Sequence, residues 1–171
     1  MPFTDLLRVT VLLTGAEATA LAAVTAVATN RDSDTRTLAV AATWWLVSLL
    51  IGLYLGRPSR ATGALRDALA GARTATSLPA ESPARIAAGR LWPIALTAVV
   101  AGVLGVFFPG VSAIASGYAL LVSLAWHSRE AAVLAIEQRD GVKFYVVPNS
   151  ALRPVQLVRS PGLRGDHLSR A

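Results

Sequence analysis

One carboxylate lies inside an apolar segment near the start of the chain. Glu17 is the only charged residue in positions 9–29, which are rich in Ala, Val and Thr. A charged side chain at the centre of a bilayer costs about 2.5–3.5 kcal/mol on insertion scales, so such a residue is a functional candidate by default. Thr10, Thr14 and Glu17 are spaced i, i+4, i+7 and share one helical face. Burial without a basic partner favours the neutral acid.

Two further hydroxyl groups are candidates to meet Glu17. A helix that begins at Val9 carries Glu17 about 12 Å into the bilayer. Ser48 and Thr97 come at a similar depth when counted from the ends of their own apolar segments. A cluster of Glu17, Ser48 and Thr97 would suit a proton or cation site, or the polar contact for a partner subunit. The alternatives are one protonated carboxyl hydrogen-bonded within the bundle, or a Glu17 near the interface if the helix begins later.

Four apolar segments are long enough to carry these side chains across a membrane. A bilayer core of about 30 Å needs about 20 helical residues. The segments are 9–29, 38–55, 91–108 and 111–127. Pro109 and Gly110 alone separate the last two. The first seven residues contain Asp5 and no Lys or Arg, so we expect the first segment to remain as a membrane helix rather than to be a signal peptide. The prediction is an all-α membrane protein, four transmembrane helices in two helical hairpins.

The composition agrees with a membrane protein. The 171 residues are 54% hydrophobic and 15% charged, whereas soluble domains have about 25% charged residues. The chain lacks Cys, which excludes disulfides and thiolate chemistry. Only one of its 16 basic residues is Lys, and Ala, Arg, Gly and Val are abundant. This composition is typical of a GC-rich bacterial genome, and we expect a multi-pass protein of the bacterial inner membrane.

The basic residues predict the orientation. Thirteen of them lie in the connector 56–90 or after position 128, against two, Arg31 and Arg36, between the first two segments. Because cytoplasmic loops are enriched in Lys and Arg, both termini are expected in the cytoplasm. Arginines in these regions are candidates to bind anionic lipid headgroups. They are Arg57, Arg60, Arg90, Arg129, Arg153 and Arg159. Nucleic acid is not an expected partner, because no aromatic stacking platform accompanies the arginines.

The sequence changes character after the fourth segment. Two runs flank Asp140-Gly141, a pair typical of a tight turn between strands, so a cytoplasmic β-hairpin is predicted over 128–150. Its first run, 131–138, could instead continue the fourth helix by a turn or two. Residues 151–171 are basic and contain Pro154 and Pro161, and we expect a flexible tail unless it docks. The transmembrane domain is then 1–127, with a possible surface helix over 61–75 of its connector.

Small residues recur at i, i+4 within three segments. The pairs are Gly52 and Gly56, Ala101 and Gly105, and Ser112 and Ser116. Such pairs let helix backbones approach closely. They predict packing within one bundle or, alternatively, contact with a second copy or a partner helix.

No motif of a known enzyme chemistry is present. The chain contains no GxxxxGK[ST], HExxH or GxSxG. His127 and His167 are isolated, so neither a metal nor a cofactor is expected. We expect a non-enzymatic interaction, regulatory or accessory membrane protein acting through its cytoplasmic hairpin and tail. The alternatives are a small transporter or transporter subunit using Glu17, and a non-catalytic subunit of a membrane enzyme.

Overall fold

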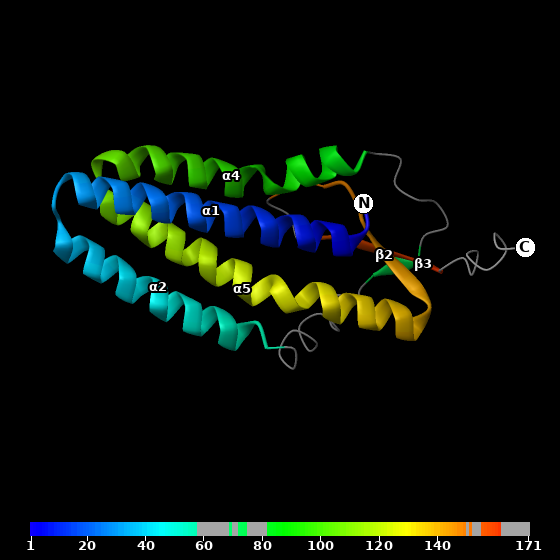
Figure 1. Ribbon diagram of the computed structural model, residues 1–171. Helices are drawn as coiled ribbons and strands as arrows, with labels where there is room; N and C mark the ends of the chain where they lie inside the picture. The colour runs from blue at the N-terminus through cyan, green and yellow to red at the C-terminus, as the bar shows by residue number, and fades with distance from the viewer. Residues whose placement is uncertain (58–68, 70–71, 75–81, 150, 152–154, 162–171) are drawn as a thin grey trace, which may run out of the picture.

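The chain forms a bundle of long helices with a small sheet at one end (Figure 1). The computed structural model describes residues 1–57, 69, 72–74, 82–149, 151 and 155–161. The helices are α1 (Phe3–Arg31), α2 (Thr35–Leu55), α4 (Pro83–Phe107) and α5 (Pro109–Asp140). The strands are β1 (Arg73–Thr74), β2 (Val142–Val146) and β3 (Leu157–Pro161). All four helices are long and apolar enough to cross a membrane, so this is a multi-pass membrane protein with four candidate spans.

The predicted fold class is confirmed, and the two helical hairpins are interleaved. In space the helices follow the order α4, α1, α5, α2 (Figure 1). α5 packs extensively against both α1 and α2, and α1 packs against α4. The consecutive helices α1 and α2 make few contacts with each other. The bundle is therefore held together mainly by contacts between the two hairpins.

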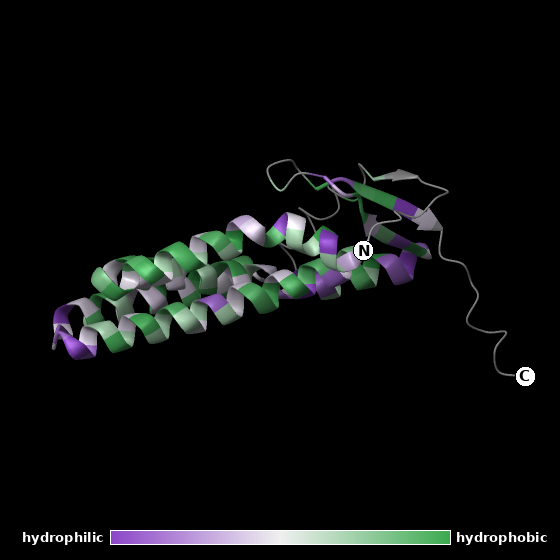
Figure 2. Cartoon of the chain, turned by 90° about the horizontal axis from the view of Figure 1, so that it is seen from above, coloured by the Kyte–Doolittle hydropathy of each residue, from purple (hydrophilic) through white to green (hydrophobic). Residues whose placement is uncertain are grey.

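The distribution of side chains is that of a protein surrounded by lipid. Large apolar residues point outward along the bundle, as Leu12, Val40 and Phe107 do with 64%, 71% and 72% of their surface exposed. Figure 2 shows hydrophobic residues along the bundle and hydrophilic residues gathered at its ends. Among the described residues, the buried polar side chains are all hydroxyls: Thr10, Thr14, Thr25, Thr29, Ser48, Ser112 and Ser116. Small and hydroxyl residues at helix contacts are typical of membrane bundles, where lipid solvates the large apolar side chains.

Most of these hydroxyls are satisfied inside the bundle. Thr10 donates to the carbonyl oxygen of Leu6 at 2.7 Å, and Thr14, Thr25 and Thr29 repeat this bond one turn back. Between helices, the hydroxyls of Thr25 and Ser112 lie 2.8 Å apart. Hydrocarbon offers no alternative partner, so each bond removes the cost of a bare hydroxyl.

A ring of arginines marks one membrane boundary. One arginine on or next to each helix lies about 20 residues from the turns at the far end of the bundle: Arg8, Arg57, Arg90 and Arg129. That separation equals about 30 Å of helix, the thickness of the hydrocarbon core. Trp92 and Trp126 lie beside two of these arginines, as expected at an interface. Between this level and the turns, all residues are described. Apart from Arg31, Arg36 and His127 near the two ends, Glu17 is the one acidic or basic side chain there.

Three helices are longer than the sequence predicts. α1 begins at Phe3 rather than 9, α4 at Pro83 rather than 91, and α5 ends at Asp140 rather than 127. α5 has 32 residues, about 48 Å, which exceeds the bilayer core. The additional turns lie beyond the arginine ring. There a helix need not be apolar, so the hydropathy of the sequence does not indicate where it begins or ends. Pro83 starts α4 because a proline in the first turn loses no hydrogen bond.

The extensions are held by a second apolar core, which we call the sheet-end core. Its buried members are Met1, Phe3, Leu6, Leu7, Leu69, Ile86, Leu91, Val133, Val142, Phe144, Val146 and Leu157. They come from the start of the chain, the first turns of α4, the last turns of α5 and the sheet. This unit therefore draws on widely separated segments and not on 128–150 alone.

The predicted hairpin over 128–150 is wrong in its first strand. Residues 131–138 are helical, as the alternative anticipated, although α5 continues for three turns rather than one or two. Gly141 adopts the left-handed conformation with φ 63° and caps α5, its N–H bonding the Glu137 carbonyl. Asp140-Gly141 thus ends a helix, because the positive φ that suits a hairpin turn also suits a helix cap.

The small antiparallel strand pair is present but uses a different partner. β2 pairs antiparallel with β3, and the two-residue β1 pairs parallel with β3, in the order β1-β3-β2. β3 comes from the region predicted as a flexible tail unless it docks, and residues 157–161 do dock, as a strand paired with β2. Val142, Phe144 and Val146 alternate into the sheet-end core. The Val146 N–H also donates to the Met1 carbonyl at 3.0 Å, which ties the start of the chain to β2.

Several predictions fall on residues outside the described part of the chain. These are most of the possible surface helix over 61–75, the lipid candidates Arg60 and Arg153, and residues 162–171 of the tail.

The turn between α1 and α2 contains a titratable helix cap. The side chain of Asp34 accepts a hydrogen bond from the Thr37 N–H at 3.0 Å at the start of α2. Hydrogen bonding by the side chain and then the N–H of Thr37 holds the pKa of the Asp34 carboxyl below its usual value of 3.8. A lowered pKa means that the cap stabilises the folded state above the unfolded-state value and that this contribution disappears as the pH falls through the folded-state value.

We expect the substitution Asp34→Asn to remove this pH dependence. The amide oxygen of Asn accepts the same bond at every pH. The wild type should therefore lose stability relative to Asp34→Asn as the pH falls below 3.8. Thermal unfolding of both proteins in detergent between neutral pH and pH about 3 measures the difference. A constant difference over that range would contradict the assignment of Asp34 as the titrating cap.

Candidate functional site

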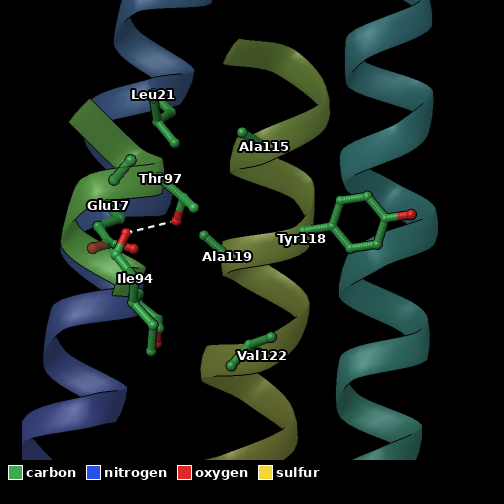
Figure 3. A pocket seen from close by; sticks show the side chains of 10 residues that line it. Glu17, Leu21, Ile94, Thr97, Ala115, Tyr118, Ala119 and Val122 are labelled. Atoms are coloured by element: carbon green, nitrogen blue, oxygen red, sulfur yellow. Dashed lines mark hydrogen bonds between the residues drawn. The ribbon is translucent and has the colours of Figure 1, made fainter. Parts of the chain in front are cut away.

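Glu17 lines a pocket inside the membrane-spanning part of the bundle. The cavity has a volume of about 300 Å³ and lies between α1, α4 and α5 (Figure 3). Its polar side chains are Thr14, Glu17 and Thr97. Tyr118 also lines it, although its ring extends away from the cavity, and the rest of the lining is apolar: Leu21, Ile94, Ala98, Ala115, Ala119 and Val122. The cavity exists because the side chains of α5 on this face are small: Ala115 and Ala119 carry only a methyl group. No basic side chain is part of the lining.

The carboxyl of Glu17 is half-buried near the middle of α1. It lies about 21 Å along the helix from either end. Its Oε1 atom is buried and has no hydrogen-bond partner among the described residues. Buried polar atoms in native proteins nearly always have a partner, so an unpartnered carboxyl oxygen facing a cavity points to a proton, a water or a ligand.

The neighbouring hydroxyls present acceptors to this pocket. Thr97 donates its hydroxyl hydrogen to the Ile94 carbonyl at 2.7 Å, the dashed line in Figure 3. Thr14 likewise donates to the Thr10 carbonyl at 2.9 Å. Since each hydroxyl has a single hydrogen, neither has one left to donate to the pocket, and both can act there only as acceptors. Together with Glu17 they form an acceptor-rich site, which suits a proton shared by the carboxyl or a small cation.

One member of the predicted cluster lies elsewhere. Ser48 is fully buried, but at the contact of α2 with α5, and it does not line the pocket. α5 stands between α2 and α4, so equal depth in the membrane does not bring Ser48 to Glu17. The Oγ atom of Ser48 has no partner among the described residues. Glu17, Thr14 and Thr97 do line one cavity.

The small-residue pairs lie at contacts within the bundle. A Cβ at Gly52 would come 2.9 Å from the Cβ of Leu124 on α5, and one at Gly56 would meet the Leu124 carbonyl oxygen. A Cβ at Gly105 would come 2.5 Å from Ser112. Ala101 and Ser116 are also buried. These positions therefore serve close packing of α2 on α5 and of α4 on α5.

Two adjacent tryptophans, Trp44 and Trp45, bridge α2 and α5. The indole N–H of Trp44 donates to the Ile114 carbonyl at 3.2 Å, and that of Trp45 to the Ala113 carbonyl at 3.0 Å. The Trp44 ring also meets Tyr118 edge-on with centroids 5.3 Å apart. Tyr118 extends away from the Glu17 pocket toward α2 (Figure 3). The Trp44 ring can lie against α5 because Gly117 has no side chain, and a Cβ at this position would collide with the indole.

The described lipid candidates have distinct surroundings. Arg57 stacks over the Tyr54 ring at 5.1 Å, and Arg129 over the Trp126 ring at 4.4 Å. Arg90 donates to the Asn149 side chain at 2.6 Å. Arg159 is exposed on β3. Arg90 and Arg129 line the same cavity, whereas Arg57 follows the end of the outer helix α2 and does not line that cavity.

The described residues bring no three His, Asp or Glu side chains together in a way that could hold a metal ion. No protein-family model, curated protein or solved structure matches the chain.

Proposed function

We propose that the chain is a non-enzymatic interaction or accessory protein of the bacterial inner membrane. Both termini lie in the cytoplasm, and the partner surface is the sheet with the tail that follows it. The sheet-end core carries this proposal: it fixes the start of the chain, α4, α5 and the sheet in one packed unit beyond the arginine ring. A chain that served only to span the bilayer would not need such a unit.

The charge of this end supports the orientation and the nature of the partner. The basic residues gather at the sheet end, as expected of a cytoplasmic face. Lys143 and Arg159 are exposed on neighbouring strands. The far end offers only a short turn, too small for a binding domain. The proposed partner is thus a protein that presents an acidic surface at the cytoplasmic face of the membrane.

The double substitution Lys143→Glu and Arg159→Glu tests the surface without altering the core. Both side chains are exposed, so folding should be retained. Proteins that co-purify with the wild type in mild detergent should be lost or strongly depleted. Arg36→Glu, an exposed charge reversal at the far end, is the matched control and should leave them unchanged. Identical co-purifying proteins in all three samples would reject the proposed surface.

Single cysteines test the orientation, since the chain has none of its own. Thr35→Cys at the turn should react with an impermeant maleimide on intact cells. Gln156→Cys, which is exposed at the sheet end, should react only after the cells are permeabilised. The reverse pattern would place the sheet outside the cytoplasm.

A second candidate function rests on the Glu17 pocket. The unpartnered Oε1 atom and the two acceptor hydroxyls would suit a small transporter, or a transporter subunit, that binds a proton or a cation. Ionisable groups within membrane spans are rare, and they mark ion pathways and proton relays.

Glu17→Gln separates this candidate from a structural role. The amide keeps the size of the side chain but cannot release a proton at the carboxyl. If Glu17 carries protons, proton flux into proteoliposomes, followed with a trapped pH-sensitive dye, should fall to the background of empty vesicles. The melting temperature in detergent should change little, because a neutral acid and an amide are similar in polarity. Wild-type flux equal to that of empty vesicles would remove the transport candidate.

A further inference from the structure

A second cavity lies at the level of the arginine ring, between the bundle and the sheet-end core. Its volume is about 320 Å³, within the range of small-molecule sites. Leu6 and Leu7 of α1, Leu91 of α4 and Leu157 of β3 form apolar walls, and Arg90 and Arg129 contribute the charges. The cavity thus has a cationic part next to an apolar part. It lies at the membrane boundary, where the headgroup of a lipid is joined to its acyl chains.

The two guanidinium groups come from different helices and face one cavity. Arg129 is partly buried with its guanidinium stacked over Trp126, and no described carboxylate lies within ion-pair distance of it. Arg90 is oriented by its hydrogen bond to Asn149 at 2.6 Å. For Arg129, partial burial of the guanidinium without a carboxylate among the described residues is costly unless an anion completes the site. The fixed planar donors of arginine match the oxygens of a phosphate.

The apolar part continues into the membrane. Ile94 lines both this cavity and the Glu17 pocket, and Thr10 and Thr14 occupy successive turns of α1 along the same path. A chain of methylene groups that enters between α1 and α4 can therefore follow Leu91 and Ile94 toward the centre of the bilayer. A soluble anion would leave these apolar walls unused.

We propose that this cavity is a binding site for one anionic phospholipid of the leaflet at the sheet end. The phosphate group binds Arg90 and Arg129, and one acyl chain lies against Leu91 and Ile94. This site differs from loose attraction of headgroups to surface arginines, because two helices and the sheet-end core build its walls. A bound lipid would tie α4 and α5 to each other beneath the sheet.

Lipid titration followed by native mass spectrometry tests the site. Wild-type protein released from detergent is titrated with dioleoyl phosphatidylglycerol, with dioleoyl phosphatidylcholine, and with glycerol 3-phosphate. We expect one tightly bound phosphatidylglycerol, at least about tenfold tighter than phosphatidylcholine, because the zwitterionic headgroup adds a cation beside the arginines. The double variant Arg90→Gln and Arg129→Gln should bind phosphatidylglycerol about tenfold more weakly or worse, as expected for the loss of charge-assisted hydrogen bonds.

Arg57→Gln is the matched control. Arg57 is also an interfacial arginine stacked on an aromatic ring, but it does not line the cavity. Its affinity for phosphatidylglycerol should stay within about twofold of the wild type, as for an exposed charge. If the double variant does not fold, judged by its helical circular dichroism, Arg129→Gln alone takes its place.

Three results would overturn the proposal. Equal affinity for the two lipids would show that the charges are not used. Glycerol 3-phosphate that binds as tightly as phosphatidylglycerol would assign the site to a soluble anion. An equal loss of affinity in Arg57→Gln would reduce the effect to general attraction between arginines and an anionic lipid.

Discussion

Gly117→Ala is expected to destabilise the bundle by about 1–3 kcal/mol, the usual cost of forcing extra volume into a packed site. A Cβ at this position would collide with the Trp44 indole and come 2.9 Å from the Ser48 Oγ. Trp44 could move only by giving up its hydrogen bond to the Ile114 carbonyl. Unfolding in a titration from mild detergent into dodecyl sulfate, followed by circular dichroism, measures the loss.

Gly89→Ala is the matched control for this substitution. Gly89 also lies in a helix, but a Cβ there would meet no atom within 4 Å. Alanine is better than glycine in a helix by about 0.5–1 kcal/mol, so stability should stay the same or rise. A similar loss in both variants would show that close approach of α2 to α5 is not what requires Gly117.

Leu7→Ala is expected to cost about 2–5 kcal/mol, as for other buried leucines. Leu7 is 1% exposed in the sheet-end core, where it supports β2 and the last turns of α5. The loss should appear first as release of the sheet. Limited proteolysis between α5 and β3 should therefore become faster while the membrane-spanning helices stay protected.

Leu12→Ala on the same helix is a control of identical chemistry. Leu12 is 64% exposed on the outside of the bundle, where lipid or detergent replaces the lost contacts. Its effect on stability should be within about 0.5 kcal/mol, as for a surface position. If Leu12→Ala were as damaging as Leu7→Ala, this face of α1 would be covered by protein rather than by lipid.

The spans could be predicted from the sequence because hydrocarbon imposes a length and a composition on them. The limits of 38–55 agree with α2 to within a few residues, since both ends of α2 lie at the membrane boundaries. The other helices continue into water, where their stability depends on the sheet-end core. Ile86 and Val133 belong to that core, and their neighbours along the chain do not reveal it.

The site was predictable only in part, for a geometric reason. Glu17 stands out because its chemistry conflicts with its surroundings, and Thr97 is brought to its pocket by the contact of α1 with α4. Ser48 is at a similar depth, but α5 lies between. Depth can be counted along a helix, whereas the neighbour of each helix depends on packing. The prediction of a hairpin turn at Asp140-Gly141 was wrong for a related reason. The same local conformation can close a hairpin or end a helix, and packing decides between them.

The interleaving of the two hairpins has a consequence for biogenesis. α1 and α2 leave the ribosome before α5 but have few contacts with each other, and the surface that each packs against most extensively lies on α5. A nascent chain with only α1 and α2 inserted is therefore an open intermediate. Its two helices must remain separated in the bilayer until α5 packs between them. Such late closure exposes hydroxyl-lined faces to lipid for the whole time of synthesis.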